Sequence, residues 1–233
     1  MNALILSLVL VSASAVSIAC SAALAPTPEH QVDPNEVLRQ AVDRLLALQS
    51  GEFALEHKKG TTVLAPGIEM SKVYGVADIP DRFRLTVEAR VSNSYVETGV
   101  VVIEDQAYMT DFLTGQWQRV PVEILPLNFS NLGQTLAEII QAVQEPRLEG
   151  AHRRDRYEAY VIVGRVRSED LATLVPNAGP GYDLGLEMWV DRSQWLLRKV
   201  VITGRLVDTD AADTVRVLTL DKIDVPVDII PPL

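Results

Sequence analysis

The sequence has few of the residues that carry covalent chemistry or cross-links. Among 233 residues there is one cysteine, Cys20, so no intramolecular disulfide can form. The three histidines, His30, His57 and His152, are far apart and none has the spacing of a metal-ligand pair, so we expect surface roles for the last two. Neither a G-x-S-x-G elbow nor a glycine-rich phosphate loop occurs. We therefore expect a protein without catalytic activity, cofactor or bound metal.

Positive charge is also scarce. Aspartate and glutamate outnumber lysine and arginine by 31 to 21, which gives a net charge of -10. The short basic cluster of Arg153, Arg154 and Arg156 is flanked by Asp155 and Glu158, so we interpret it as a solvated strand or loop. Because nucleic-acid binding requires clustered cations that neutralise phosphates, we expect no nucleic-acid partner.

One acidic cluster, at Asp208, Asp210 and Asp213, has carboxylates near the alternate spacing of calcium loops. It lacks the turn glycine and the late glutamate of an EF-hand. It also lies between two predicted strands, where aspartate commonly forms turns. We therefore predict a turn here rather than a calcium site.

The N-terminal segment has no charged residue over positions 1–28. Its apolar stretch, residues 3–16, is as long as a signal-peptide core and short for a membrane-spanning helix, which needs about 20 residues. The following "SIAC" resembles a bacterial lipobox ending at Cys20, while small residues at 22–25 offer an ordinary secretory cleavage site as the alternative. Ser17 stands where a lipobox prefers leucine. No lysine or arginine precedes the apolar stretch, which is consistent with a true start further upstream.

The single cysteine favours the lipobox. On this interpretation residues 1–19 are a signal peptide, and Cys20 becomes the first residue, with its sulfur carrying a diacylglycerol. Two acyl chains hold a protein firmly at a membrane, whereas one chain is marginal. Residues 20–33 then form a lipidated N-terminus and tether, and residues 34–233 form a single domain because no long linker interrupts them.

Two segments have the apolar spacing of amphipathic helices. The first begins with Asp33 as N-cap, and Pro34 and Glu36 occupy positions typical of a first turn. The second runs from about Asn131, and a short capped helix follows at Ser168. The apolar positions that predict the two longer helices are Leu38, Ala41, Val42, Leu45 and Leu46, and then Leu132, Leu136, Ile139, Ile140 and Val143.

Much of the remaining sequence alternates apolar and polar residues, which is typical of half-buried antiparallel strands. The pattern is strict over residues 81–91 and recurs over residues 183–191. Turn residues at 104–105 and 114–115 join neighbouring strands by short connections. We predict eight to eleven strands and two or three helices. The expected fold is α+β, a large curved antiparallel sheet covered by those helices.

The order of several short motifs resembles one family. A hairpin reads "AYMTDFLTGQWQRVP", with an aromatic residue, an aspartate and then Thr-Gly-x-Trp. The motifs "YEAYVIVGRV", "LATLVPNA", "LEMWVD" and "VPVDIIPP" follow in that order. The segment from about residue 35 to 232 is similar to the LppX/LprG family of bacterial lipoproteins, whose fold resembles the LolA-like lipoprotein carriers. The resemblance implies a half-open antiparallel β-barrel closed by helices, with an apolar cavity that holds acyl chains.

Alternation along the strands predicts which side chains would line such a cavity, opposite the second helix. A closed core filled by the same residues is the alternative. The predicted lining residues are Leu85, Val87, Val91, Val101, Ile103, Leu136, Ile139, Ile140, Val143, Leu186 and Met188.

The leading hypothesis is a membrane-anchored extracytoplasmic lipoprotein that binds the acyl chains of a lipid or lipoglycan and carries them to an acceptor. We expect a monomer whose partners are this ligand, the membrane and, as a further candidate, a transporter. The alternative is a cell-surface interaction or sensor module with a filled core and no lipid cargo. A hydrolase is the third hypothesis, but no feature of the sequence pairs two carboxylates as a general acid and a general base.

Overall fold

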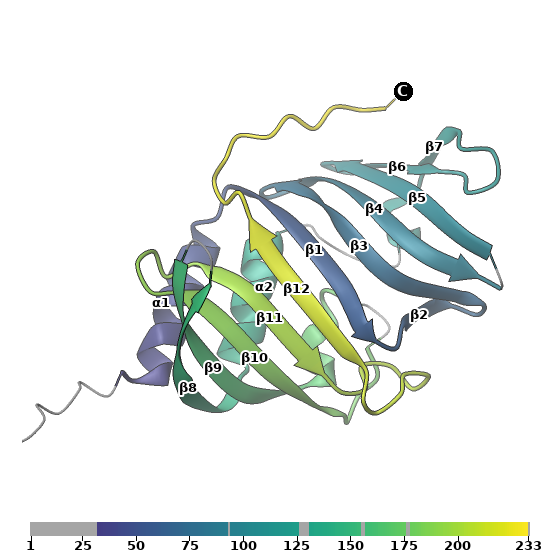
Figure 1. Ribbon diagram of the computed structural model, residues 1–233. Helices are drawn as coiled ribbons and strands as arrows, with labels where there is room; N and C mark the ends of the chain where they lie inside the picture. The colour runs from purple at the N-terminus through teal and green to yellow at the C-terminus, as the bar shows by residue number, and fades with distance from the viewer. Residues whose placement is uncertain (1–31, 93, 126–130, 155–156, 176–177, 233) are drawn as a thin grey trace, which may run out of the picture. The chain divides into compact units, whose positions relative to one another are not determined.

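The computed structural model describes residues 32–92, 94–125, 131–154, 157–175 and 178–232 (Figure 1). The described residues form a 12-stranded antiparallel sheet, two α-helices and two 3-10 helices. The helices are α1 (Pro34–Leu46), η1 (Val122–Ile124), α2 (Leu132–Gln141) and η2 (Ser168–Leu171). The strands are β1 (Ser50–Lys59), β2 (Thr62–Ala65), β3 (Ile68–Asp78), β4 (Arg82–Val91), β5 (Ser94–Ile103), β6 (Gln106–Thr110), β7 (Trp117–Val120), β8 (Gln144–Arg154), β9 (Tyr157–Arg167), β10 (Asp183–Asp191), β11 (Leu197–Thr203) and β12 (Val215–Asp221).

The strand order joins two meanders through the first and last strands of the chain. Along the sheet the order is β7-β6-β5-β4-β3-β1-β12-β11-β10-β9-β8, and β2 pairs with β3 outside this path. β1 and β12 pair in the middle, with Leu55 opposite Leu218. The sheet therefore has a β3–β7 half and a β8–β12 half, which lie at the upper right and the lower left of Figure 1.

The predicted fold class is confirmed, and three details differ. The described residues contain more strands than the eight to eleven expected, because β2 and β8 show no clean alternation in the sequence. Strand pairing does not follow chain order throughout, because the last strand, β12, pairs with β1 at the centre of the sheet. The third helix is a single 3-10 turn that begins at Ser168 itself.

Both α-helices begin where the sequence predicts. Asp33 caps α1 by accepting a hydrogen bond from the Asn35 N–H at 2.9 Å. α2 follows Asn131, whose backbone is left-handed with a φ of 52°. The two helices touch at Gly133, where a Cβ atom would collide with the carbonyl oxygen of Leu45. Glycine therefore permits the close approach that makes the helix pair one continuous cover.

The main core lies between the helix pair and one face of the sheet, which we call the inner face (Figure 1). Just after α2, Val143 packs against Gly164 of β9, where a Cβ atom would collide with the valine side chain. Within the part of the chain that the structure describes, no helix is both long and apolar enough to span a membrane. Core residues with almost no exposed surface include Val37, Ala41, Val73, Ile162, Leu184, Met188 and Leu197.

A second, smaller cluster lies on the opposite side of the sheet, the outer face. It joins Val101 of β5 and Tyr108 of β6 to Ile229, which follows β12 in the C-terminal segment. The Arg84 guanidinium holds the same segment by donating a hydrogen bond to the carbonyl oxygen of Ile230 at 3.3 Å. The C-terminal segment thus covers part of the outer face of the β3–β7 half.

Candidate functional site

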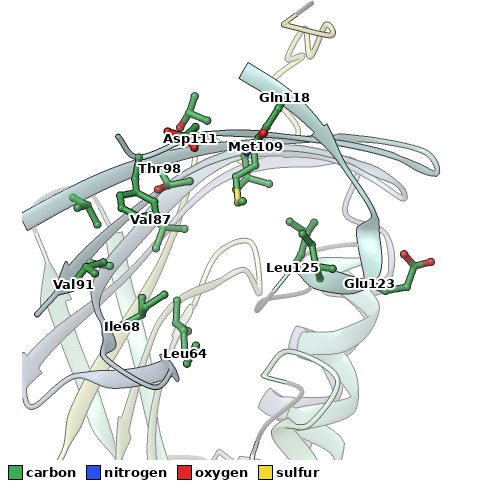
Figure 2. Close-up of a pocket in the computed structure, with 17 residues that line it drawn as sticks. Leu64, Ile68, Val87, Val91, Thr98, Met109, Asp111, Gln118, Glu123 and Leu125 are labelled. Carbon is green, nitrogen blue, oxygen red and sulfur yellow. The ribbon is translucent and has the colours of Figure 1, made fainter. Parts of the chain in front are cut away.

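A pocket of about 510 Å³ opens on the inner face of the β3–β7 half (Figure 2). Its walls come from β4, β5 and β6, from the β2–β3 hairpin and from the segment around η1. Pockets that bind small molecules commonly measure about 300–1,000 Å³. The lining residues are Leu64, Ala65, Ile68, Val87, Ala89, Val91, Val96, Thr98, Val100, Met109, Thr110, Asp111, Phe112, Gln118, Glu123, Ile124 and Leu125.

The pocket has a buried apolar floor and an open mouth. Val87, Ala89 and Val100 form the floor, and all three side chains are buried. At the mouth, the exposed fractions of Phe112 and Ile124 are 50% and 57%. Such a gradient suits an elongated apolar guest that enters with one end and leaves the other end in water.

Alternate residues of two paired strands build the floor and the wall that continues from it. β4 and β5 pair antiparallel, with Val87 opposite Thr98 and Ala89 opposite Val96. Because successive residues of a strand point to opposite faces, only every second residue of each strand reaches the pocket. Figure 2 shows Met109 pointing into the same space from β6.

The other sides of the pocket are also apolar. Figure 2 shows Leu64 and Ile68 of the β2–β3 hairpin below the open space and Leu125 on its other side. Glu123 belongs to the lining, but its carboxylate points away from the pocket in this view. The pocket can therefore hold hydrocarbon, because apolar side chains surround its middle.

Hydrogen bonds within the protein occupy polar groups near the mouth. The Thr110 hydroxyl oxygen accepts a hydrogen bond from the Gly99 N–H at 2.8 Å. Asp111 Oδ1 accepts from the N–H groups of Thr114 at 2.8 Å and Leu113 at 2.9 Å. These bonds, with Thr114 the largest contributor, hold the pKa of Asp111 below its ordinary value. One carboxylate oxygen of Asp111 is therefore engaged in shaping a turn.

Only two of the predicted lining residues, Val87 and Val91, line this pocket. The expectation that Val101 and Ile103 face it is wrong, because both belong with the cluster on the outer face. The register pairs inner-facing Phe83 with Val102, one residue away from the expected alternation. The remaining predicted residues Leu85, Leu136, Ile139, Ile140, Leu186 and Met188 are buried in the main core, and Val143 packs against it.

The predicted lipidation site, Cys20, lies outside the described residues. Sequence reasoning also missed two walls of the pocket, namely Leu64 and Ile68 of the β2–β3 hairpin and Ile124 and Leu125 around η1. The signal for the hairpin was a Pro-Gly pair between apolar residues, and Gly67 adopts the left-handed conformation with a φ of 79°. No comparable signal marks the segment around η1.

A buried polar network joins β1, β2 and β12, and none of its members lines the pocket. Arg216 forms an ion pair with Asp210 and donates from Nε to the Thr62 hydroxyl at 2.9 Å. His57 Nε2 lies 2.8 Å from the same hydroxyl, and Nδ1 lies 2.9 Å from the Ser71 carbonyl oxygen. Burial lowers the pKa of His57. This histidine is therefore half-buried and structural, not the surface residue that was expected.

The three aspartates tested as a calcium loop have separate partners. Asp208 accepts a hydrogen bond from the Tyr182 hydroxyl at 2.8 Å, and Asp213 pairs with Lys59. Asp210 is the partner of the buried arginine described above. Among the residues that the structure describes, no group of three metal-ligating side chains converges.

Two of the solved structures with a similar fold are those of mycobacterial proteins. LprF from Mycobacterium bovis aligns with a TM-score of 0.67 at 18% identity, covering 87% of this chain and 99% of that one. The lipoprotein LppX from Mycobacterium tuberculosis aligns with a TM-score of 0.58 at 15% identity, covering 85% of this chain and 100% of that one. At such identities the likeness concerns the fold alone. No curated protein sequence matches the chain.

The family assignment rests on the sequence as well as on the fold. The family model described as LppX_LprAFG lipoprotein matches residues 33–229, which is most of the chain and all the strands and helices of the sheet and its cover. The large open antiparallel sheet with two α-helices is the fold shared with LprF and LppX. The chain therefore belongs to the LppX_LprAFG lipoprotein family.

Proposed function

We propose that this protein binds an acyl chain of a lipid or lipoglycan in the pocket of Figure 2 and carries it through the extracytoplasmic space. The observation that carries the proposal is the polarity of the pocket, with a buried apolar floor on β4 and β5 and a mouth open to solvent. Membership of a lipoprotein family supports it, as does the fold shared with the lipoprotein LppX.

Burial of hydrocarbon supplies binding energy without a catalytic group. Each methylene transferred from water to an apolar site contributes about 0.8 kcal/mol. Gln118 and Glu123 lie at the exposed mouth, where a polar headgroup can stay hydrated. We therefore expect affinity to depend on acyl-chain length more than on the headgroup, and exchange to require no covalent step.

The same proposal includes attachment to a membrane. Residues 1–19 would be removed as a signal peptide, Cys20 would carry a diacylglyceryl group, and residues 20–33 would tether the domain of residues 34–233. The protein would act as a monomer outside the cytoplasm, with a transporter as a further candidate partner. Intact-mass measurement of the mature chain tests the anchor: a diacylglyceryl mass on Cys20 that is lost in Cys20→Ser supports it, and an unmodified N-terminus elsewhere contradicts it.

A filled pocket gives the sharpest test of lipid binding. Val91→Trp and Val96→Trp place an indole at partly buried lining positions, so each should lower affinity for a fluorescent fatty acid at least about tenfold. Val225→Trp is the matched control, because Val225 is 47% exposed and lies outside the lining. A parent protein that neither co-purifies with lipid nor binds the probe would overturn the proposal, as would unchanged affinity in both lining variants.

A further inference from the structure

Three large apolar side chains are exposed on the two segments that border the pocket, the β6–β7 turn and η1. The exposed fractions are 50% for Phe112, 81% for Leu113 and 57% for Ile124. We call these three residues the apolar rim. Phe112 and Ile124 also line the pocket, so the rim continues the apolar lining out to the surface. Exposed apolar groups gathered beside one site are typical of contact with another apolar phase.

Hydrogen bonds build the β6–β7 turn that carries Phe112 and Leu113. Asp111 Oδ1 accepts from the Leu113 N–H at 2.9 Å and from both the N–H and the hydroxyl of Thr114, at 2.8 and 3.1 Å. Gly115 then takes the left-handed conformation with a φ of 69°, which closes the turn. The turn therefore fixes the backbone that carries both exposed apolar residues.

Packing on the outer face fixes the same turn from its other end. Trp117, the first residue of β7, lies over Gly99 of β5, where a Cβ atom would be 2.8 Å from the indole ring. The Asp-x-x-Thr-Gly-x-Trp pattern in the sequence thus positions two of the three rim residues, Phe112 and Leu113.

A second turn of the molecule shows that such a turn does not require apolar residues. Asp191 Oδ1 accepts hydrogen bonds from the N–H groups of Ser193 at 2.8 Å and Gln194 at 3.2 Å, the same pattern as in the β6–β7 turn. Its exposed residues are Arg192, Ser193 and Gln194. The hydrogen bonds of the turn therefore do not require Phe112 and Leu113 to be apolar, so their apolar character has another cause.

We propose that the apolar rim inserts into the surface of a lipid bilayer, so that the pocket mouth faces the acyl chains. This rests on the proposed function, which makes a membrane lipid the ligand. The charged residues of the pocket lining are Asp111 and Glu123, and both are acidic. Insertion is therefore driven by apolar burial rather than by attraction to anionic headgroups, and it should persist at high salt.

A depth measurement tests the insertion directly. The full chain with Leu113→Cys is labelled with an environment-sensitive fluorophore and mixed with phosphatidylcholine vesicles. We expect a blue shift and quenching by brominated acyl chains. Leu46→Cys on α1 is the matched control, since Leu46 is 50% exposed, and it should show neither effect. The chain without a new cysteine gives the background from Cys20. Equal responses at both positions, or none at position 113, would overturn the proposal.

Transfer kinetics separate this inference from the proposed function. Leu113 does not line the pocket, so Leu113→Glu should bind a fluorescent fatty acid in solution as the parent does. Its transfer of that probe to phosphatidylcholine vesicles should slow about tenfold, at low and high salt alike, while Leu46→Glu transfers normally. Normal transfer by Leu113→Glu would overturn the proposal that the rim inserts into the bilayer, but it would leave the proposed lipid binding intact. A slowing confined to transfer to a protein acceptor would also overturn it, whereas absence of binding by the parent would sink the proposed function.

Discussion

The two halves of the sheet have similar strands and different covers. In the β8–β12 half, the inner-facing residues Ile162, Leu184 and Met188 have no exposed surface. In the β3–β7 half, by contrast, inner-facing Val87 and Val100 line a pocket. Figure 1 shows why: both α-helices, of 13 and 10 residues, lie behind the β8–β12 half. The helices therefore close the inner face of the β8–β12 half, whereas the β3–β7 half contributes to the same core and leaves a pocket open beside it.

The largest effect is expected where the halves meet, at the β1–β12 junction. Asp210→Ala leaves the Arg216 guanidinium buried without its carboxylate, which should lower the free energy of unfolding by about 3–5 kcal/mol. Asp213→Ala, which removes only an exposed ion pair with Lys59, should leave the free energy of unfolding almost unchanged. Chemical denaturation measures both values. Similar costs for the two variants would show that the junction is no more important than the surface.

A pair of methionines compares the halves themselves. Met188→Ala opens a cavity in the covered half and should lower the free energy of unfolding by about 2–5 kcal/mol. Met109→Ala removes a side chain that already borders the pocket, so we expect about 1 kcal/mol or less and a larger pocket. Denaturation midpoints at equal slope give the comparison. Equal losses would mean that the β3–β7 half is packed as tightly as the other.

Local signals were enough to predict much of the fold. Asp33 and its neighbours mark the start of α1, and alternation marks β4 and β10, because caps and side-chain periodicity depend on residues close in sequence. The pairing of β1 with β12 was not predictable in the same way. It joins residues such as Leu55 and Leu218, and the sequence of neither strand indicates that its pairing partner lies so far away in the chain.

The pocket was harder to predict than the sheet. Alternation assigns Val87 and Met188 equally to the inner face, but it does not say which of them a helix covers. The run "VVVI" at residues 100–103 is apolar throughout, so it gave no register. The C-terminal segment explains this run, because Ile229 covers Val101 on the outer face and both faces of β5 are therefore buried there.

The smallest effect is a pH dependence at the junction. Burial lowers the pKa of His57 below its ordinary value of 6.5. The hydrogen bond with the Ser71 carbonyl and the charge of Asp210 oppose this shift, and the charge of Arg216 adds to it. The unfolded chain therefore binds more protons than the folded one as pH falls through that value, so stability is full above it and declines below it. The denaturation midpoint at about pH 5.5 should fall relative to that at about pH 7.5, and His57→Gln should lose part of this difference, whereas His152→Gln, at an exposed position, should keep it. If His57→Gln retained the whole difference between the two midpoints, the junction would not be the source of the pH dependence. A titrating group elsewhere in one of the two halves would then have to cause it.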